Sequence, residues 1–363
     1  MREETSLQYL QQLPKAELHV HLEGAIKPAT VLELARRHSR LDVLPAADEA
    51  GLQSWFKFQD FRHFIKIYLA ISDLLRTPED FELIAYQLGA DMAAQNILYR
   101  EATFTPYTHV EYQDKGLSIQ DILAGLDRGR LAARRDFGVE IRWIFDIPRD
   151  ICFKDSDGHY DSLPAEKTVE YALIGRPNGV VGLGLGGNEV NAPALPFAHA
   201  FESARREGLA RIPHAGETMG PVSVWEAIDF LGAQRVGHGV RSIQDPQLVK
   251  TLAERGIVLD INPTSNICLH VYEDFAMHPF KQLDRSGVLV TVNSDDPALF
   301  NTSLVQEYKV LAKHFGYKKA DLLRIARNAF LYASVEEPVK SQLLQRFDAY
   351  TKIHETGKTS SPA

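Results

Sequence analysis

Short hydrophobic runs rich in β-branched residues alternate along the chain with longer segments of amphipathic, helix-like pattern. The runs cover eight ranges, near 16–22, 97–105, 139–147, 179–186, 211–215, 235–238, 256–261 and 288–294. Helix-like segments such as "SIQDILAGLDRGRLAARRDF" and "GPVSVWEAIDFLG" lie between them, and 25–95 has enough helical pattern for several helices. This alternation is typical of parallel strands joined by helices. The pattern therefore predicts an α/β fold, a (β/α)8 TIM barrel with extra helices between strands 1 and 2.

The domain organisation follows from the length and from the lack of internal boundaries. A chain of 363 residues could hold two average domains or one large barrel with insertions. We find no repeat of fixed period, no low-complexity segment and no interior linker. We therefore expect a single domain over 1–350, and the polar segment "HETGKTSSPA" predicts a loose C-terminal tail within 351–363.

The charge balance points to a small-molecule partner. Lys and Arg total 40 against 48 Asp and Glu, a formal net charge of −8, which argues against binding of nucleic acid or anionic lipid. The N-terminus is polar, and no apolar run is long enough to span a bilayer, so we expect a cytoplasmic protein. Cys152 and Cys268 are far apart and suit buried positions in a reducing compartment rather than a thiolate metal cluster.

Two histidines stand two residues apart in the first predicted strand, "AELHVHLEG". Residues i and i+2 of a strand point to the same face, so the imidazoles of His19 and His21 would converge on one point, as metal ligands do. The alternative is a pair of half-buried histidines that bond to the backbone.

Further polar residues stand where other predicted strands end, which is where barrel enzymes carry their active sites. His214 and Glu217 end the fifth strand in "PHAGE", His238 ends the sixth in "GHG", and Asp295 and Asp296 end the eighth in "NSDDP". Taken singly, His238 could be a turn residue and "SDDP" a helix N-cap. Their joint placement at strand ends favours one shared site.

The residue types suit a zinc site. Three imidazoles and a carboxylate are ligands that Zn²⁺ prefers, and a catalytic zinc keeps one position open for water. The candidate ligands are His19, His21, His214 and Asp295. A bound divalent metal lowers the pKa of its water to about 7, which creates hydroxide at neutral pH. Asp296 and His238 could orient and deprotonate this water, while Glu217 could deliver a proton to the substrate. The sequence therefore predicts metal-assisted hydrolysis with one Zn²⁺ per chain.

The motifs "LPKAELHVHLEGA", "HAGE", "GHG", "PTSNI" and "VTVNSDDPALF" resemble the signatures of the adenosine deaminases of the amidohydrolase superfamily, in the same order. The resemblance extends from about Leu13 to about residue 350. It implies a mononuclear zinc on the four ligands above, with Glu217 protonating purine nitrogen 1. It also implies that hydroxide attacks ring carbon 6, assisted by His238 and Asp296, and that ammonia leaves.

The resemblance also suggests substrate contacts. In "GLGGNE", Gly187 matches a backbone position that approaches purine nitrogen 3 in that family, although it could be a plain turn glycine. The aromatic segment "WFKFQDFRHFIKIY" at 55–68 looks like the family's helical gate. Phe58 and Phe61 are its candidate apolar contacts to the nucleoside, with ordinary core packing as the alternative.

Two positions depart from the pattern of members that act on adenosine. Glu23 stands where those members usually carry an Asp that touches the ribose 5′-hydroxyl, and Thr103 stands where they usually show Arg. If Glu23 faces the sugar, its carboxylate should disfavour a 5′-phosphate. The alternative for Glu23 is an exposed acid that caps the segment before "IKPATVLELA".

These departures leave several substrates open. The main hypothesis is deamination of adenosine to inosine and ammonia. The first alternative is 6-amino-6-deoxyfutalosine, a menaquinone precursor with an adenine base and a benzoate-bearing extension on the 5′ side, which some relatives resembling this chain deaminate. Adenine deaminases, which often show "EG" here, and a non-catalytic nucleoside-binding relative are further alternatives. The last would predict loss of a ligand or of Glu217, and both are present.

Other classes of deaminase and hydrolase lack support in the sequence. A binuclear amidohydrolase would typically need a bridging lysine at the end of the fourth strand, and "GVVGLGLGGNE" contains none. Cytidine-type zinc deaminases use His-x-Glu with Pro-Cys-x-x-Cys, which is also absent.

Overall fold

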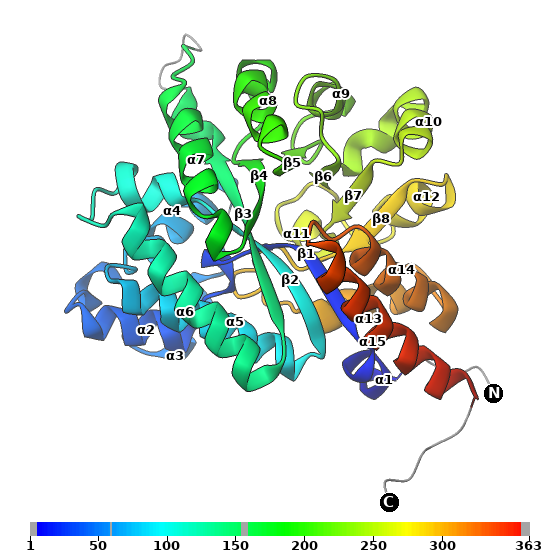
Figure 1. Ribbon diagram of the computed structural model, residues 1–363, viewed down its shortest axis with the longest axis horizontal. Helices are drawn as coiled ribbons and strands as arrows, with labels where there is room; N and C mark the ends of the chain where they lie inside the picture. The colour runs from blue at the N-terminus through cyan, green and yellow to red at the C-terminus, as the bar shows by residue number, and fades with distance from the viewer. Residues whose placement is uncertain (1–5, 59, 154–158, 357–363) are drawn as a thin grey trace, which may run out of the picture.

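Eight parallel strands form a barrel in the computed structural model, which describes residues 6–58, 60–153 and 159–356. The strands are β1 (Lys15–His21), β2 (Ile97–Phe104), β3 (Glu140–Pro148), β4 (Val180–Gly186), β5 (Ala210–Ala215), β6 (Arg235–His238), β7 (Val258–Ile261) and β8 (Leu289–Val292). They follow one another around the centre of the molecule with the helices outside (Figure 1). The predicted TIM barrel and its eight strand positions are confirmed.

The barrel closes between its last and first strands through the residues that follow β8. Val20 pairs with Asp295 in a parallel bridge. The backbone N–H of His21 donates to the carbonyl of Asp295 at 2.8 Å, and the N–H of Asp295 donates to the carbonyl of His19 at 3.2 Å. Closure of the barrel therefore places Asp295 directly beside the histidines of β1.

Helices surround the barrel and fill the long connection between β1 and β2. The α-helices are α1 (Leu7–Gln12), α2 (Pro28–Arg37), α3 (Glu49–Trp55), α4 (Phe61–Ser72), α5 (Pro78–Ala94), α6 (Ile119–Phe137), α7 (Leu163–Ile174), α8 (Ala198–Arg206), α9 (Pro221–Asp229), α10 (Pro246–Arg255), α11 (Pro263–Cys268), α12 (Phe280–Arg285), α13 (Leu304–Lys313), α14 (Lys319–Leu331) and α15 (Glu337–Thr356). The expected extra helices between the first two strands are α2 to α5. The two helix-like segments quoted above form α6 and α9.

Local sequence signals explain where α6 begins and ends. Ser118 is its N-cap: the side chain accepts from the N–H of Asp121 at 3.2 Å, and the Asp121 carboxylate accepts from the N–H of Ser118 at 3.0 Å. Gly138 ends the helix with a φ of 67°, a left-handed conformation that glycine adopts without strain. The capping hydrogen bonds of Ser118 and the left-handed Gly138 account for the two ends of α6.

The C-terminal helix extends further than the sequence predicts. α15 continues to Thr356, past the expected boundary at residue 350. The remainder of the expected tail, 357–363, lies outside the described residues. In the part of the chain that is described, no helix has the length and apolar character needed to cross a membrane. Cys152 is buried, and Cys268 is half-buried.

A buried ionic cluster crosses the interior of the barrel. Arg235 of β6 donates to Glu101 of β2 at 2.6 Å and to Asp260 of β7 at 2.9 Å. Thr291 of β8 donates to the other oxygen of Asp260 at 2.7 Å. These four side chains are almost completely buried, so the cluster joins strands on opposite sides of the barrel through charged contacts.

Candidate active site

Three histidines and one aspartate meet at the carboxyl ends of the strands. β1 carries His19 and His21, β5 carries His214, and Asp295 follows β8. Asp295 Oδ1 lies 3.3 Å from His19 Nε2 and 3.4 Å from His21 Nε2. His21 Nε2 lies 3.2 Å from His214 Nε2, and one ligand atom from each of the four residues lies within 4.8 Å of the others. The fold therefore brings together the four side chains predicted as metal ligands.

Two residues of the site adopt left-handed backbone conformations. His238 has a φ of 61° and Asp295 a φ of 64°, values that are uncommon for residues other than glycine. The hydrogen bonds that close the barrel hold Asp295 in this conformation. Backbone strain of this kind persists where the surrounding structure fixes it, and it clusters at functional sites.

The electrostatic environment favours neutral imidazoles at His21 and His214 and an ionised carboxylate at Asp295. Burial lowers the pKa of His21 to about 4, and burial together with His19 and His21 holds the pKa of His214 well below its usual range. Burial acts to raise the pKa of Asp295, but the neighbouring imidazoles of His19, His21 and His238 outweigh it and lower the pKa. Neutral imidazole and ionised carboxylate are the protonation states that bind a metal.

This donor set fits zinc. Zn²⁺ binds imidazole nitrogen and carboxylate oxygen, and the four candidate donor atoms converge on one point. His19 Nε2 is buried without a hydrogen-bond partner among the described residues, as a nitrogen reserved for a metal would be. His19, His21, His214 and Asp295 would hold the ion.

We expect the purified protein to contain one zinc ion per chain, because the site offers one set of four converging donors. Elemental analysis after gel filtration measures the zinc content. His214→Ala should leave well under one zinc per chain, whereas His199→Ala, which removes an exposed histidine of α8, should leave the content unchanged. A stoichiometric second metal ion, or full zinc content in His214→Ala, would contradict this ligand assignment.

Glu217 lies in a loop held by a second glutamate. The backbone N–H groups of Gly216 and Glu217 donate to the carboxylate of Glu189 at 2.8 and 2.9 Å. Arg241 donates to the carbonyl oxygen of Glu217 at 2.8 Å. Burial raises the pKa of Glu217 well above its usual range, and the carboxylates of Asp295 and Glu189 act in the same direction. A carboxyl group with a raised pKa is suited to act as a general acid.

A chain of hydrogen bonds fixes the tautomer of His238. The N–H of Phe280 donates to His278 Nδ1 at 3.2 Å, so His278 Nε2 carries the proton and donates to Asn266 Oδ1 at 3.0 Å. The Asn266 amide nitrogen then donates to His238 Nδ1, as does that of Asn262, at 3.2 and 3.3 Å. His238 Nε2 therefore holds the proton and faces Asp295 Oδ2 at 3.8 Å.

Asp296 occupies a space that only a glycine neighbour allows. A Cβ atom on Gly24 would lie 1.8 Å from Asp296 Oδ1, so a side chain at residue 24 would displace the carboxyl group. Burial raises the pKa of Asp296 well above its usual range, with Asp295 and Glu23 adding to the effect. The Oδ1 atom has no hydrogen-bond partner within the described part of the chain. Asp296 is thus available to a ligand.

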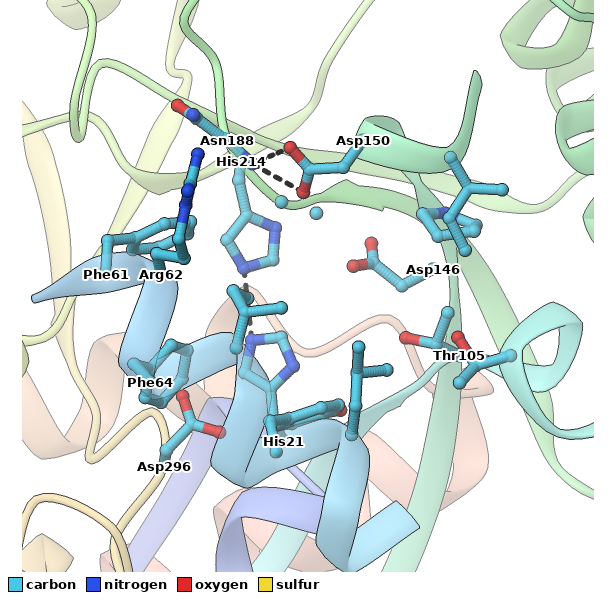
Figure 2. A pocket seen from close by; sticks show the side chains of 18 of the residues that line it. His21, Phe61, Arg62, Phe64, Thr105, Asp146, Asp150, Asn188, His214 and Asp296 are labelled. Atoms are coloured by element: carbon cyan, nitrogen blue, oxygen red, sulfur yellow. Dashed lines mark hydrogen bonds between the residues drawn. The ribbon is translucent and has the colours of Figure 1, made fainter. Parts of the chain in front are cut away.

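A cavity of about 810 Å³ opens above these residues. Figure 2 shows His21 and His214 facing one another in it. The cavity lining includes the predicted site residues His21, Phe61, Gly187, His214, Glu217, His238, Asp295 and Asp296. A volume of this size is near the upper end of the range for small-molecule sites. The predicted catalytic residues and three of the four predicted metal ligands therefore share one pocket, and His19 lies beneath its lining.

Gly187 has a conformation that favours glycine. Its φ is 101°, and a Cβ atom here would lie 2.4 Å from Asp150 Oδ2. The next residue, Asn188, donates its N–H to the Asp150 carboxylate at 3.0 Å (Figure 2). Gly187 is therefore a turn glycine whose backbone also lines the cavity.

Glu23 lies behind the cavity wall. It is 1% exposed, and its carboxylate accepts a hydrogen bond from His109 Nε2 at 2.9 Å. His109 belongs to the π-helical turn Thr108–Tyr112, and its other nitrogen contacts Lys115 Nζ at 2.8 Å. Glu23 is absent from the residues that line the cavity, so the structure places it as a buried partner of His109. Thr103 is likewise buried, in β2 beside His21.

The two aromatic candidates of the gate segment differ in position. Phe61, the first residue of α4, lines the cavity. Phe58 instead packs against Phe64 and Phe300, with ring centroids 5.4 and 5.7 Å away, and does not line the cavity. Residue 59 of the segment lies outside the described residues.

Sequence reasoning missed three buried residues at this site. Asp146 lies near the end of β3 and faces the cavity, Glu189 anchors the loop that carries Glu217, and Arg149 donates to the carbonyl of His214 at 2.9 Å. Asp146 obeys the rule that identified the other site residues, since it is a polar residue at the carboxyl end of a barrel strand. Applying that rule to "FDIP" in the third strand would have found it.

Comparisons with known proteins agree with this geometry. The family described as adenosine deaminase matches residues 14–350. An aminodeoxyfutalosine deaminase from Streptomyces coelicolor is 41% identical over 94% of this chain and 86% of its own length, and an adenine deaminase from Sinorhizobium fredii is 38% identical over 92% and 97%. The crystal structure of a zinc-bound amidohydrolase from Burkholderia ambifaria aligns with a TM-score of 0.82 at 29% identity, covering 95% of this chain and 93% of the other. The chain belongs to the adenosine deaminase family and is a zinc-dependent hydrolase that deaminates an aminopurine substrate.

Proposed function

We propose that this protein deaminates 6-amino-6-deoxyfutalosine, with adenosine as the second candidate substrate. This reverses the order of the two hypotheses drawn from sequence. The 41% identity to an aminodeoxyfutalosine deaminase over nearly the whole chain supports the change. The observation that carries the proposal is the shape and lining of the cavity, which extends well beyond the space that an adenine base needs.

The mouth of the cavity combines aromatic and basic side chains. Helix α4 contributes Phe61, Phe64 and Ile65 to the lining, and from the same helix the exposed residues Arg62 and Lys66 also line it. Arg62 and Lys66 are four residues apart and therefore lie on one face of the helix. A benzoate group presents an aromatic ring and a carboxylate, which match apolar contacts and a guanidinium partner. Neither adenosine nor adenine would use the basic side chains.

The residues of the chain divide the chemistry between them. Protonated Glu217 donates to purine nitrogen 1, which makes ring carbon 6 more electrophilic. His238, which carries its proton on Nε2, donates to the attacking water and orients it, whereas Asp296 accepts the water's proton. Asp296 passes this proton to the amino group, which leaves as ammonia, and the remaining hydroxyl proton returns to Glu217 as the carbonyl forms. When bound, zinc supplies a Lewis acid that makes water nucleophilic near neutral pH. The backbone of Gly187 contacts the opposite edge of the base.

A substrate panel tests the proposal. We expect kcat/KM for 6-amino-6-deoxyfutalosine to exceed that for adenosine by about tenfold or more, because a hydrogen-bonded charged contact contributes roughly 1.5–3 kcal/mol. 2′-Deoxyadenosine, adenine and adenosine monophosphate complete the panel, measured under the same conditions. A preference for free adenine or for the monophosphate would overturn the proposal, and a preference for adenosine would promote the second candidate.

A matched pair of variants separates recognition of the substrate's benzoate carboxylate from a general effect of surface charge on kcat/KM. Arg62→Gln/Lys66→Gln should lower kcat/KM for 6-amino-6-deoxyfutalosine by about tenfold and leave kcat/KM for adenosine nearly unchanged. The control, Lys309→Gln/Lys313→Gln, removes two exposed lysines with the same spacing from α13, away from the cavity. Equal losses for both substrates in the first variant would contradict a role in binding the carboxylate.

A further inference from the structure

Asp146 is a buried carboxyl group that the chemistry above does not use. It lies near the end of β3, is 3% exposed and lines the cavity. Its Oδ1 atom has no hydrogen-bond partner among the residues that the structure describes. Figure 2 shows the carboxyl group pointing into the cavity, on the side opposite Phe61.

Two glycines of the neighbouring strand make room for this carboxyl group. Asp146 pairs with Gly184 in the register of β3 and β4. A Cβ atom on Gly184 would lie 2.3 Å from Asp146 Oδ1, and one on Gly186 would lie 2.0 Å from Oδ2. Any side chain at either position would occupy the space of the carboxyl oxygens. The sequence "GLGLGG" of β4 therefore keeps Asp146 in the cavity wall.

Among the described residues, no hydrogen bond or ion pair joins Asp146 to a cation, and the nearest influence is that of Arg149. Burial raises the pKa of Asp146 well above its usual range, and Arg149 only partly opposes the effect. Arg149 itself donates to the carbonyls of Ala192 and His214, at 3.1 and 2.9 Å. A buried polar group without a partner costs free energy, so such groups in native proteins need an explanation. A hydrogen-bond donor on a bound ligand would supply the missing partner.

The position of Asp146 indicates which part of the ligand it would meet. In the proposed binding mode, the reacting edge of the purine faces Glu217 of the β5 loop, and the opposite edge faces Gly187 after β4. The sugar-bearing nitrogen 9 is bonded to carbon 4, next to nitrogen 3, so the sugar leaves the base on the side of Gly187. The ends of β3 and β4 form the cavity wall there.

We propose that Asp146 binds the ribose of the substrate and accepts hydrogen bonds from its 2′- and 3′-hydroxyl groups. This inference rests on the proposed function, since it requires a nucleoside rather than a free base. Two adjacent hydroxyl donors match the two oxygens of one carboxylate. Adenosine and 6-amino-6-deoxyfutalosine carry the same two hydroxyls, so Asp146 would select nucleosides over adenine whichever of the two is preferred.

The first test needs only the unmodified enzyme. Removing the 2′- or 3′-hydroxyl from adenosine should lower kcat/KM by about tenfold or more for at least one of the two analogues, because it leaves a buried acceptor of Asp146 without its partner. Equal kcat/KM for adenosine, 2′-deoxyadenosine and 3′-deoxyadenosine would overturn the proposal.

The second test assigns the effect to Asp146. Asp146→Ala should lower kcat/KM for adenosine by a similar factor and leave kcat/KM for adenine within about twofold of the unmodified enzyme. The variant should also have similar kcat/KM values for adenosine and its deoxy analogues. Zinc content and Tm should stay near those of the unmodified enzyme. An equal loss for adenosine and adenine would show a structural role and would sink the inference.

Binding measurements separate this inference from the proposed function. Calorimetry with the zinc-loaded protein compares inosine, which keeps the ribose, with hypoxanthine, which lacks it. Asp146→Ala should weaken the binding of inosine by about tenfold and leave the affinity for hypoxanthine unchanged. If only adenine were deaminated, the proposed function would fail. Unchanged inosine affinity would then overturn the role of Asp146 as well, whereas a selective loss of inosine binding would support it independently.

Discussion

Glu217→Gln is expected to lower kcat by about 10²–10⁴ while zinc content stays at the level of the unmodified enzyme. Glutamine keeps the size of the side chain but cannot transfer a proton to the purine. Glu217 is outside the group of four converging ligands, although it converges with His238 and Asp295 in a second group, so its replacement leaves all four assigned metal donors in place. A steady-state ultraviolet assay of deamination, together with elemental analysis of the same sample, measures both quantities.

A second buried glutamate provides the matched control. Glu307 on α13 is fully buried, and it accepts hydrogen bonds from the N–H of Thr264 at 3.1 Å and from Thr302 Oγ1 at 2.5 Å. Glu307→Gln makes the same change of chemistry in a buried position that does not line the cavity, and kcat should stay within about threefold. Near-normal turnover in Glu217→Gln would remove Glu217 from its role as the acid. Loss of zinc in that variant would instead place it at the metal.

The fold was predictable because each barrel strand carries its signal locally. A strand that is buried on both faces appears as a short continuous hydrophobic run, and helices between the runs appear as amphipathic segments. The metal site was predictable for a related reason. Barrel topology brings strand ends together, so the ends of β1, β5 and β8 indicate neighbours in space although they lie far apart in the sequence.

The substrate contacts were less predictable because they depend on distant partners. Glu23 turns toward His109, which lies 86 residues further along the chain, and no local pattern around Glu23 contains that information. Phe58 and Phe61 look equivalent in the sequence, and both pack against Phe64, yet Phe58 also contacts Phe300 and only Phe61 lines the cavity. Asp146 stands inside an apolar run, and its access to the cavity depends on glycines of the next strand.

The buried cluster around Arg235 was also missed, although it links β2, β6 and β7 inside the barrel. Arg235 is 3% exposed, and burial acts to lower its pKa, but the carboxylates of Asp260 and Glu101 outweigh burial and raise it. The side chain also donates to the carbonyl of Tyr332 at 3.0 Å, on the outer layer of helices. One guanidinium thus neutralises two carboxylates that the barrel holds away from water.

Arg235→Met is expected to lower the free energy of unfolding by about 3–5 kcal/mol, because it leaves two buried carboxylates without a cation. Urea unfolding followed by circular dichroism measures the change, with the slope of the transition compared between variants. Arg205→Met is the control: Arg205 is exposed on α8 and pairs with the half-buried Glu202, so its loss should have little effect.

Replacing the two unpaired carboxylates by neutral side chains should recover part of the lost free energy of unfolding. A buried ion cluster can often be replaced by neutral side chains at little cost, whereas removing one partner alone is strongly destabilising. The variant Arg235→Met/Glu101→Gln/Asp260→Asn should therefore be more stable than Arg235→Met. If the two variants unfold at the same urea concentration, the cost comes from the lost packing of the arginine stem rather than from unpaired charge. If Arg235→Met matches the Arg205→Met control, the cluster contributes no stability and the barrel tolerates the unpaired carboxylates by protonating them.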